Sequence, residues 1–291
     1  MSIVIQTILP VFLIVLTGYA IGRRKRINIQ ILIDLIIYLA SPCLIFSSIS
    51  RSDINLTDFF TITCSAVAII LTLAFFTFFI LKLKKSKKVG VYLPLSIGNT
   101  GNLGYPIALF AFGAAGLSRA IVYDMMSSLF IFSLGIYIVH RKNDIKEAFK
   151  IPLIYAVIFG LMFNLLKIPV PEIIFKPIEI IGMITIPLAL LILGYKLTEI
   201  KVSSMKIALL ASLFKIIGGF IMAVIIINLF SITGLVRDVI ILQASMPSAV
   251  MSMILTAKYK RDASLVASIV FLTTVISAFS IPLILWFLTW Y

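Results

Sequence analysis

Histidine and cysteine are scarce in this sequence of 291 residues, which contains one histidine, His140, and two cysteines, Cys43 and Cys64. Histidine-based catalysis and most zinc or haem sites need several such ligands or a partnered histidine. Both cysteines lie inside apolar runs, so we interpret them as small core residues rather than a redox pair. No phosphate-binding loop or metalloprotease signature is present. The sequence therefore predicts neither an enzyme nor a bound cofactor, and it leaves a metal ligand undefined.

Charged residues are also scarce, at 12% of the chain, whereas 62% of residues are apolar and the mean hydropathy is +1.18. A soluble domain has about 25% charged and about 45–50% apolar residues, so a soluble enzyme, a disordered chain and a disulfide scaffold are excluded. The net charge of +14 would ordinarily suggest nucleic acid as a partner. Here the cations fall in short gaps between apolar runs, as in membrane proteins. We predict an all-α integral membrane protein that does not bind nucleic acid.

The apolar runs are long enough to cross a bilayer repeatedly, since a span needs about 20 apolar residues. No loop between them is long enough to form a soluble domain, so residues 1–291 are interpreted as a single membrane domain. The ten predicted transmembrane helices are 3–22, 31–50, 59–81, 89–113, 120–139, 151–166, 178–198, 207–230, 239–257 and 263–290.

The distribution of Lys and Arg predicts the orientation of these spans. Nineteen of the 25 basic residues fall in the odd-numbered loops, including the runs Arg23–Arg26 and Lys82–Lys88, and five fall in the even-numbered loops. Basic loops face the cytoplasm. We therefore expect a multi-pass protein of the cell membrane with both its N- and C-termini outside.

Prolines suggest an internal repeat. Three pairs are separated by similar distances of 142, 145 and 141 residues: Pro10 and Pro152, Pro42 and Pro187, and Pro106 and Pro247. Chance is one explanation, because proline is not rare in membrane helices. A true repeat would divide the chain into residues 1–139 and 151–291, five helices each, joined by a cytoplasmic loop at 140–150. An odd number of helices inverts the second half relative to the first, as in many secondary transporters.

Two of the predicted spans carry residues that break helices. The fourth contains Gly98-Asn99-Thr100-Gly101-Asn102-Leu103-Gly104-Tyr105-Pro106, and the ninth contains Gln243-Ala244-Ser245-Met246-Pro247-Ser248. Glycine costs about 1 kcal/mol and proline about 3 kcal/mol in a helix interior. Irregular backbone cannot face lipid, so such breaks must line a cavity or be packed in protein. Ordinary proline kinks are the alternative, but the density of breakers in the fourth span favours two broken helices that cross at a binding site.

The crossing is suited to a small organic anion. No Arg lies in any span, so a carboxylate would be held by amide donors and by the positive ends of helices. We expect Asn99, Asn102 and Gln243 to supply donors, with Pro106 and Pro247 in the first turns of the resuming helices and Ser245 as an N-cap.

Ionisable residues inside spans are functional candidates by default, and Asp124 and Lys215 lie farthest from the ends of their spans. Asp124, about five residues into the fifth span, is either a ligand for a coupling proton or cation, or a water-facing carboxylate near the start of a helix. For Lys215, in the eighth span, we expect a side chain that extends back to the cytoplasmic surface.

The elements Asn99-Thr100-x-x-x-Gly104-x-Pro106 and Gln243-x-x-x-Pro247 resemble the auxin efflux carrier family, over the whole chain. The resemblance implies a five-plus-five inverted repeat related to bile acid:sodium symporters, helices 4 and 9 crossing at their prolines, and elevator-type movement. It also implies that Asn99 contacts the substrate. Gly101 and Asn102 stand where plant auxin exporters carry apolar residues, and the long cytoplasmic loop of many of those proteins is missing. Both departures argue against auxin as the substrate.

The expected function is secondary transport of a small organic carboxylate. The alternatives are a sodium-coupled uptake symporter of the bile-acid type and, from a different class, an anion channel or a membrane receptor. Expected partners are the lipid bilayer, the carboxylate and a coupling proton or sodium ion, and assembly as a homodimer stays open. The candidate substrate-binding residues are Asn99, Thr100, Gly101, Asn102, Gly104, Pro106, Gln243, Ser245 and Pro247, and Asp124 is the candidate coupling residue.

Overall fold

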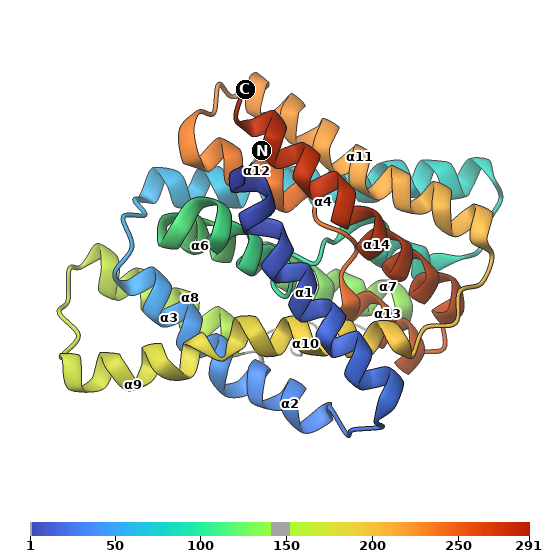
Figure 1. The fold of residues 1–291 in the computed structure, drawn as a ribbon. Coiled ribbons are helices and arrows are strands. Elements are labelled where there is room, and N and C mark those ends of the chain that lie inside the picture. Colours follow the sequence, from blue (N-terminus) through green and yellow to red (C-terminus); the bar gives the residue numbers. More distant parts are fainter. Residues whose placement is uncertain (1, 141–151) are drawn as a thin grey trace.

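The computed structural model describes residues 2–140 and 152–291, and in these residues all regular structure is helical (Figure 1). The predicted connecting loop 140–150 lies outside the described residues, apart from His140. The α-helices are α1 Ser2–Arg24, α2 Gln30–Leu35, α3 Ser41–Ser50, α4 Leu56–Leu83, α5 Tyr92–Ser96, α6 Gly104–Phe130, α7 Ile136–His140, α8 Pro152–Leu165, α9 Glu172–Met183, α10 Thr185–Thr198, α11 Met205–Leu229, α12 Gly234–Ala244, α13 Val250–Lys258 and α14 Ala263–Leu288. Single π-helical turns at Ile36–Ala40 and Ile131–Gly135 join α2 to α3 and α6 to α7.

Seven of the helical segments in the described part of the chain are long and apolar enough to cross a membrane. The remaining three predicted spans, 89–113, 151–166 and 239–257, are either divided or short. Gly104–His140 counts as one of the seven although Gly113, at φ 68°, interrupts the helix within it. An L-residue rarely adopts that φ, so glycine permits the chain to turn where the fourth predicted span ends. The protein is thus an all-helical membrane protein, and the count of ten spans stays a prediction.

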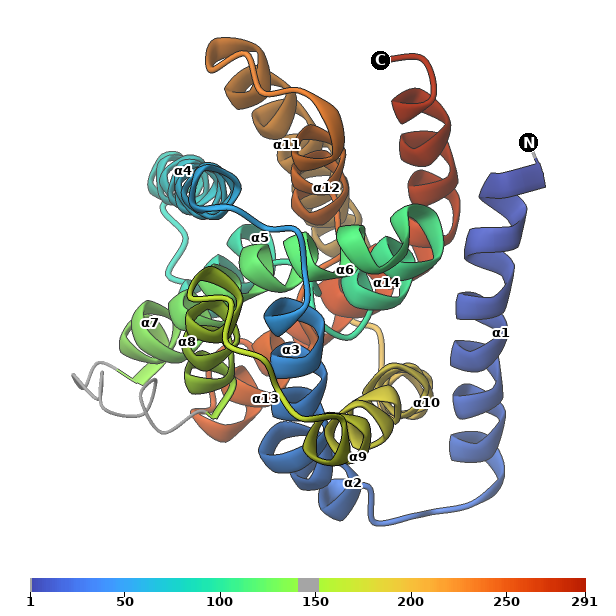
Figure 2. The same ribbon diagram turned by 90° about the vertical axis from the view of Figure 1, so that its left-hand side faces the viewer.

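The helices form two groups. We call α1, α2, α3, α8, α9 and α10 the frame helices, and α4 to α7 and α11 to α14 the crossing helices. Within the frame, α1 packs along α10, and α3 packs on α8 and α9. Within the second group, α4 packs on α6 and α11, and α14 packs on α11 and α13. Figure 2 separates α9, α10, α2 and α3 from α4, α11 and α12, with α6 between them.

Close backbone contact holds α1 against α10. A Cβ atom at Gly18 would collide with the Leu191 carbonyl oxygen, and one at Gly194 would collide with the Val15 carbonyl oxygen. Only glycine allows two helices to approach so closely, and small residues serve the same purpose in other membrane helix pairs. This pair forms one side of the frame.

Four of the predicted odd-numbered loops, the first, third, seventh and ninth, lie within the described residues and gather at one end of the molecule, which we call the basic end. The Ile27 amide donates to the Tyr195 hydroxyl (2.9 Å), which joins the α1–α2 loop to the last turns of α10. The Gly90 amide donates to Asp262 Oδ2 (3.0 Å), which joins the loop after α4 to the loop before α14. At the opposite end Arg119 pairs with Asp53 and Asp58, at 2.8 and 2.6 Å. The described loops are therefore sorted to two ends as the Lys and Arg pattern predicts, and the side of the membrane that each end faces stays a prediction.

Lys215 differs from the expectation. Its side chain is 2% exposed and lies within the packed crossing helices rather than at a surface. The prediction that it extends back to the cytoplasmic surface is wrong, because α11 is covered on this face by α14, α12 and α5.

Candidate functional site

The first helix break occupies residues 97–103, between α5 and α6. α5 ends at Ser96, and the chain is extended at Ile97 before it turns back into a helix at Gly104. The Asn99 carbonyl accepts hydrogen bonds from the Gly104 amide (3.1 Å) and, more weakly, from the Leu103 amide (3.4 Å). The glycines and asparagines that predicted a break are thus in the broken segment itself.

The second break, residues 245–249 between α12 and α13, runs antiparallel to the first. Gly98 and Ser248 form an isolated β-bridge, in which the Asn99 amide donates to the Pro247 carbonyl (2.6 Å) and the Ala249 amide donates to the Ile97 carbonyl (3.1 Å). Ser248 Oγ also donates to the Pro94 carbonyl (2.7 Å). The two irregular segments therefore satisfy each other's backbone groups, as a membrane interior requires.

Two details of the predicted crossing are wrong. Ser245 caps the C-terminal end of α12, with its hydroxyl donating to the Ile241 carbonyl (2.7 Å), rather than the N-terminal end of the next helix. Pro247 lies in the paired extended segment, three residues before α13 begins at Val250, and so is not in a first turn. Pro106 does lie in the first turn of α6, as predicted.

Fewer backbone donors are free at the start of α6 than we expected. The amides of Gly104 and Tyr105 donate to the carbonyls of Asn99 and Gly101, because the tight turn at 100–103 folds back onto the helix. The donors available on this side of the crossing are therefore chiefly side-chain amides.

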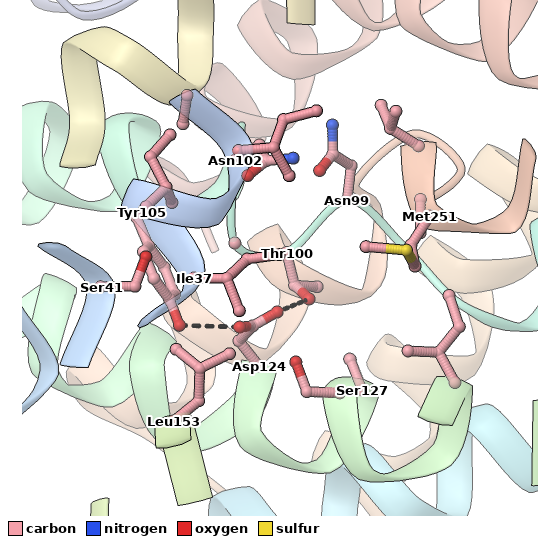
Figure 3. A pocket seen from close by; sticks show the side chains of 18 of the residues that line it. Ile37, Ser41, Asn99, Thr100, Asn102, Tyr105, Asp124, Ser127, Leu153 and Met251 are labelled. Carbon is pink, nitrogen blue, oxygen red and sulfur yellow. Dashed lines mark hydrogen bonds between the residues drawn. The ribbon is translucent and has the colours of Figure 1, made fainter. Parts of the chain in front are cut away.

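A cavity of about 340 Å³ lies between the two groups of helices, beside the first break (Figure 3). Its wall on the side of the crossing helices includes Gly98, Asn99, Thr100, Gly101, Asn102, Tyr105, Asp124, Ser127, Ser128, Val250 and Met251. Its wall on the side of the frame includes Ile33, Ile37, Tyr38, Ser41, Leu153, Thr185, Ile186 and Lys196. Ile33 and Lys196 belong to the helix ends nearest the basic end, so the cavity extends from the break toward that end.

Asp124 is held in this wall by two hydroxyl groups. Thr100 Oγ1 donates to Asp124 Oδ1 (2.5 Å), and the Tyr105 hydroxyl donates to Asp124 Oδ2 (2.7 Å) (Figure 3). Thr100 belongs to the first break, so the carboxylate is tied directly to the irregular backbone. Gly101 faces the same carboxylate, and a Cβ atom at this position would lie 3.3 Å from Asp124 Oδ2.

Asn99 and Asn102 lie on the cavity wall above Asp124 in the view of Figure 3. Asn99 is 4% exposed, and its Nδ2 atom makes no hydrogen bond within the described residues. Burying an amide without a partner costs about 1–3 kcal/mol. This donor is therefore available to a ligand in the cavity.

Gln243 is placed differently from the prediction. It is 1% exposed, does not line the cavity, and packs against Gly104, where a Cβ atom would collide with Gln243 Oε1. Both polar atoms of its amide lack a hydrogen-bond partner in the described part of the structure. Gly104, Pro106, Ser245 and Pro247 are likewise absent from the cavity wall. These residues build the crossing, whereas Asn99 to Asn102 and Asp124 face the cavity.

Several polar residues of the cavity were missed by the sequence analysis: Tyr38, Ser41, Tyr105, Ser127, Ser128, Thr185 and Lys196. The sequence indicates two of them indirectly. Ser41 and Thr185 lie within two residues of Pro42 and Pro187, one of the three proline pairs that suggest the internal repeat. Within the described residues, no three His, Cys, Asp or Glu side chains gather closely enough to hold a metal ion.

An all-helical membrane protein with two paired helix breaks beside a polar-walled cavity has the architecture of a membrane transporter. The chain belongs to the membrane transport protein family, whose sequence profile matches residues 3–147 and 139–285. It is similar to two uncharacterized archaeal transporters. The one from Methanocaldococcus jannaschii is 32% identical over 97% of this chain and 98% of its own. The one from Methanothermobacter thermautotrophicus is 31% identical over 96% of each chain.

The family and its members indicate a multi-pass membrane transporter and not an enzyme. At this level the resemblance to the auxin efflux carriers is confirmed. The relation to bile acid:sodium symporters stays a prediction.

Proposed function

We propose that the protein is a secondary transporter that carries a small organic carboxylate across the cell membrane. The observation that carries the proposal is the cavity at the first helix break, where the amides of Asn99 and Asn102 face a space large enough for a small metabolite. The Nδ2 atom of Asn99 has no hydrogen-bond partner among the described residues, so it can donate to a ligand. Amide donors suit a carboxylate that must be released as readily as it is bound, since no fixed ion pair has to be broken.

The Asp124 carboxylate explains why transport of the organic anion would be coupled to a proton or another cation. An anion that enters the cavity comes close to the Asp124 carboxylate, and two like charges in a low-dielectric site repel each other strongly. Binding is favourable only if a proton or another cation neutralises one of them. We therefore infer that Asp124 is the coupling residue, and that a proton or a cation moves together with the carboxylate.

An elevator-type movement is supported by the position of the cavity between the two groups of helices. The wall formed by the crossing helices carries the amides and the carboxylate, whereas the polar groups of the frame wall are three hydroxyls and one lysine. No hydrogen bond joins these frame residues to Asn99, Asn102 or Asp124 in the described part of the structure, so sliding the crossing helices past the frame breaks few polar interactions at the cavity. The cavity reaches toward the basic end in this structure, so we assign the structure to the state open to the cytoplasm.

The packing of the frame supports the inverted repeat. α1 packs on α10, which pairs predicted spans 1 and 7, and α8 packs on α3, which pairs predicted spans 6 and 2. In the predicted repeat, span 6 corresponds to span 1 and span 7 to span 2. The contact between spans 1 and 7 is then equivalent to the contact between spans 6 and 2. Gly18 of α1 and Gly160 of α8, 142 residues apart, each lie in one of these interfaces.

The orientation follows from the basic end, which we place in the cytoplasm with both termini outside. A reporter that is active only in the cytoplasm should be silent when fused after Tyr291 and active when inserted at Lys85. The reverse result would contradict the orientation and the state assigned to the cavity.

The function itself is tested with purified protein in liposomes. Thermal shifts are first screened against small mono- and dicarboxylates, with and without sodium, and the stabilising compound is then used as a labelled substrate. We expect saturable uptake, and equal counterflow when the compound is present on both sides. A flux that rises linearly with concentration would indicate a channel, and binding without flux would indicate a receptor.

A further inference from the structure

The function proposed above does not use Lys215, which is the most deeply buried charged side chain in the described part of the structure. It lies in the middle of α11, ten residues after Met205 or about 15 Å along the helix. Its side chain is 2% exposed and makes no hydrogen bond or ion pair with another described residue. A lysine held at this depth in a membrane is costly and requires compensation from its surroundings.

No carboxylate on the described helices that pack against α11 provides this compensation. α11 packs against α4, α5, α12 and α14. The charged residues of these helices are Asp58, Lys82, Arg237 and Asp238. Asp58 is paired with Arg119 (2.6 Å) and Asp238 with Arg237 (2.8 Å), both near the end of the molecule opposite the basic end. The compensation must therefore come from dipoles.

The register of α11 places Lys215 between the ends of the two broken helices. One turn after it, Gly219 packs so closely on the end of α12 that a Cβ atom would collide with the Ala244 carbonyl oxygen. One turn before it, Ala211 packs in the cluster that contains Leu95 of α5. Residues four apart lie on the same face of a helix, so Lys215 faces the point where α5 and α12 end.

That point carries negative potential. The C-terminal end of a helix has a partial negative charge, because its last carbonyls have no partner within the helix. At the end of α12 no described amide donates to the Ala244 carbonyl, and at the end of α5 the buried Ser96 hydroxyl has no hydrogen-bond partner among the described residues. In transporters with interrupted helices, such C-terminal ends and unwound carbonyls commonly bind the coupling cation.

We propose that Lys215 is a tethered cation, whose ammonium group takes the place of a free metal cation at the ends of α5 and α12. The crossing therefore needs no sodium ion, which leaves the proton as the coupling ion at Asp124, and its fixed positive charge favours an anion in the adjacent cavity. The second effect rests on the proposed carrier function, whereas the first does not.

The experiment removes the tether and supplies a free cation. Lys215→Ala leaves space for a small ion, and Lys206→Ala, which changes an exposed lysine in the first turn of the same helix, is the matched control. The unfolding temperature of each purified protein is measured in choline, sodium and methylammonium chloride at equal ionic strength. We expect sodium or methylammonium to raise the unfolding temperature of Lys215→Ala by several degrees over choline, because an ion that binds only the folded state stabilises it. Wild type and Lys206→Ala should show no such difference. An unfolding temperature of Lys215→Ala that is independent of the cation would overturn the proposal.

Two further measurements keep the proposal open to refutation if Lys215→Ala does not fold. Wild-type uptake of the carboxylate found in the thermal-shift screen should be equal in sodium and choline, and sodium-dependent wild-type uptake would overturn the proposal. Lys215→Met keeps the volume but not the charge, so it should weaken carboxylate binding roughly tenfold, the order of magnitude expected when a unit charge near a partly buried anion is removed. Unchanged affinity would contradict the proposed effect on the anion. If wild type binds no carboxylate, the proposed function fails, and the cation dependence of Lys215→Ala still decides the role of the lysine.

Discussion

The two helix breaks share a backbone arrangement but differ in what their side chains do. Residues 97–103 present Asn99, Thr100 and Asn102 to the cavity. In residues 245–249, Ser245 and Ser248 are fully buried and bond to backbone, and only Ala249 reaches the cavity wall. Opening a helix exposes peptide groups in either case, but ligand contact also requires polar side chains on the open side. We conclude that the first break forms the binding surface and the second supports it.

The largest expected effect concerns Asp124, which is bonded to the first break through Thr100. Asp124→Asn removes the titratable charge and keeps the size of the side chain. We expect it to abolish accumulation of the carboxylate against a gradient while exchange at equal concentrations continues, because exchange requires no net movement of the coupling ion. Uptake and counterflow in liposomes measure the two activities separately. Concentrative uptake at the wild-type level would show that Asp124 has only a structural role.

The next prediction compares one amide from each break region. Asn99→Ala removes a donor to a charged ligand, which costs about 1.5–3 kcal/mol, so the dissociation constant should rise roughly 10- to 150-fold with unchanged membrane expression. Gln243→Ala, which changes an amide that does not line the cavity, should alter it by less than about threefold. Titration of each purified variant with the carboxylate gives both values. Equal losses, or the larger loss for Gln243→Ala, would remove the distinction between the two breaks.

A smaller effect is expected where the two break regions touch. Gly104→Ala places a Cβ atom against the Gln243 amide, and overpacking of this kind destabilises a protein by about 1–3 kcal/mol. Shortening the opposing side chain in the double variant Gly104→Ala/Gln243→Ala should recover part of this loss. Chemical denaturation of the four proteins gives the coupling free energy. Additive losses would show that the Gln243 side chain moves aside without cost.

The smallest effect is expected for Pro247→Ala in the second break. The Pro247 carbonyl, which accepts from the Asn99 amide (2.6 Å), is retained in the variant. The main change is greater freedom of the unfolded chain, so we expect a loss of about 0.4–1 kcal/mol in stability and an unchanged dissociation constant. Thermal unfolding and carboxylate titration test the two halves of this prediction. A large fall in affinity would mean that the proline ring itself shapes the cavity.

The cavity residues that could be predicted are those whose local sequence is unusual for a membrane helix. Gly98 to Asn102 break the fourth span, and Asp124 is a carboxylate within the fifth, so both are conspicuous in any apolar run. Ser127, Ser41 and Thr185 are not, because a hydroxyl can bond within its own helix and is common in spans that bind nothing. Only their neighbours in space show that they line a cavity.

Composition, hydropathy and the breaking residues by themselves determined that this chain is a helical membrane protein with two interrupted helices and sorted basic loops. These properties depend on local energies, namely the cost of polar backbone in lipid and of glycine and proline in a helix. The tertiary structure alone decided that Asn99 faces the cavity whereas Gln243 packs behind Gly104, and that Lys215 is buried at the ends of α5 and α12 instead of extending to the surface. Which way a side chain points depends on the helices that cover it, and those helices come from distant parts of the sequence.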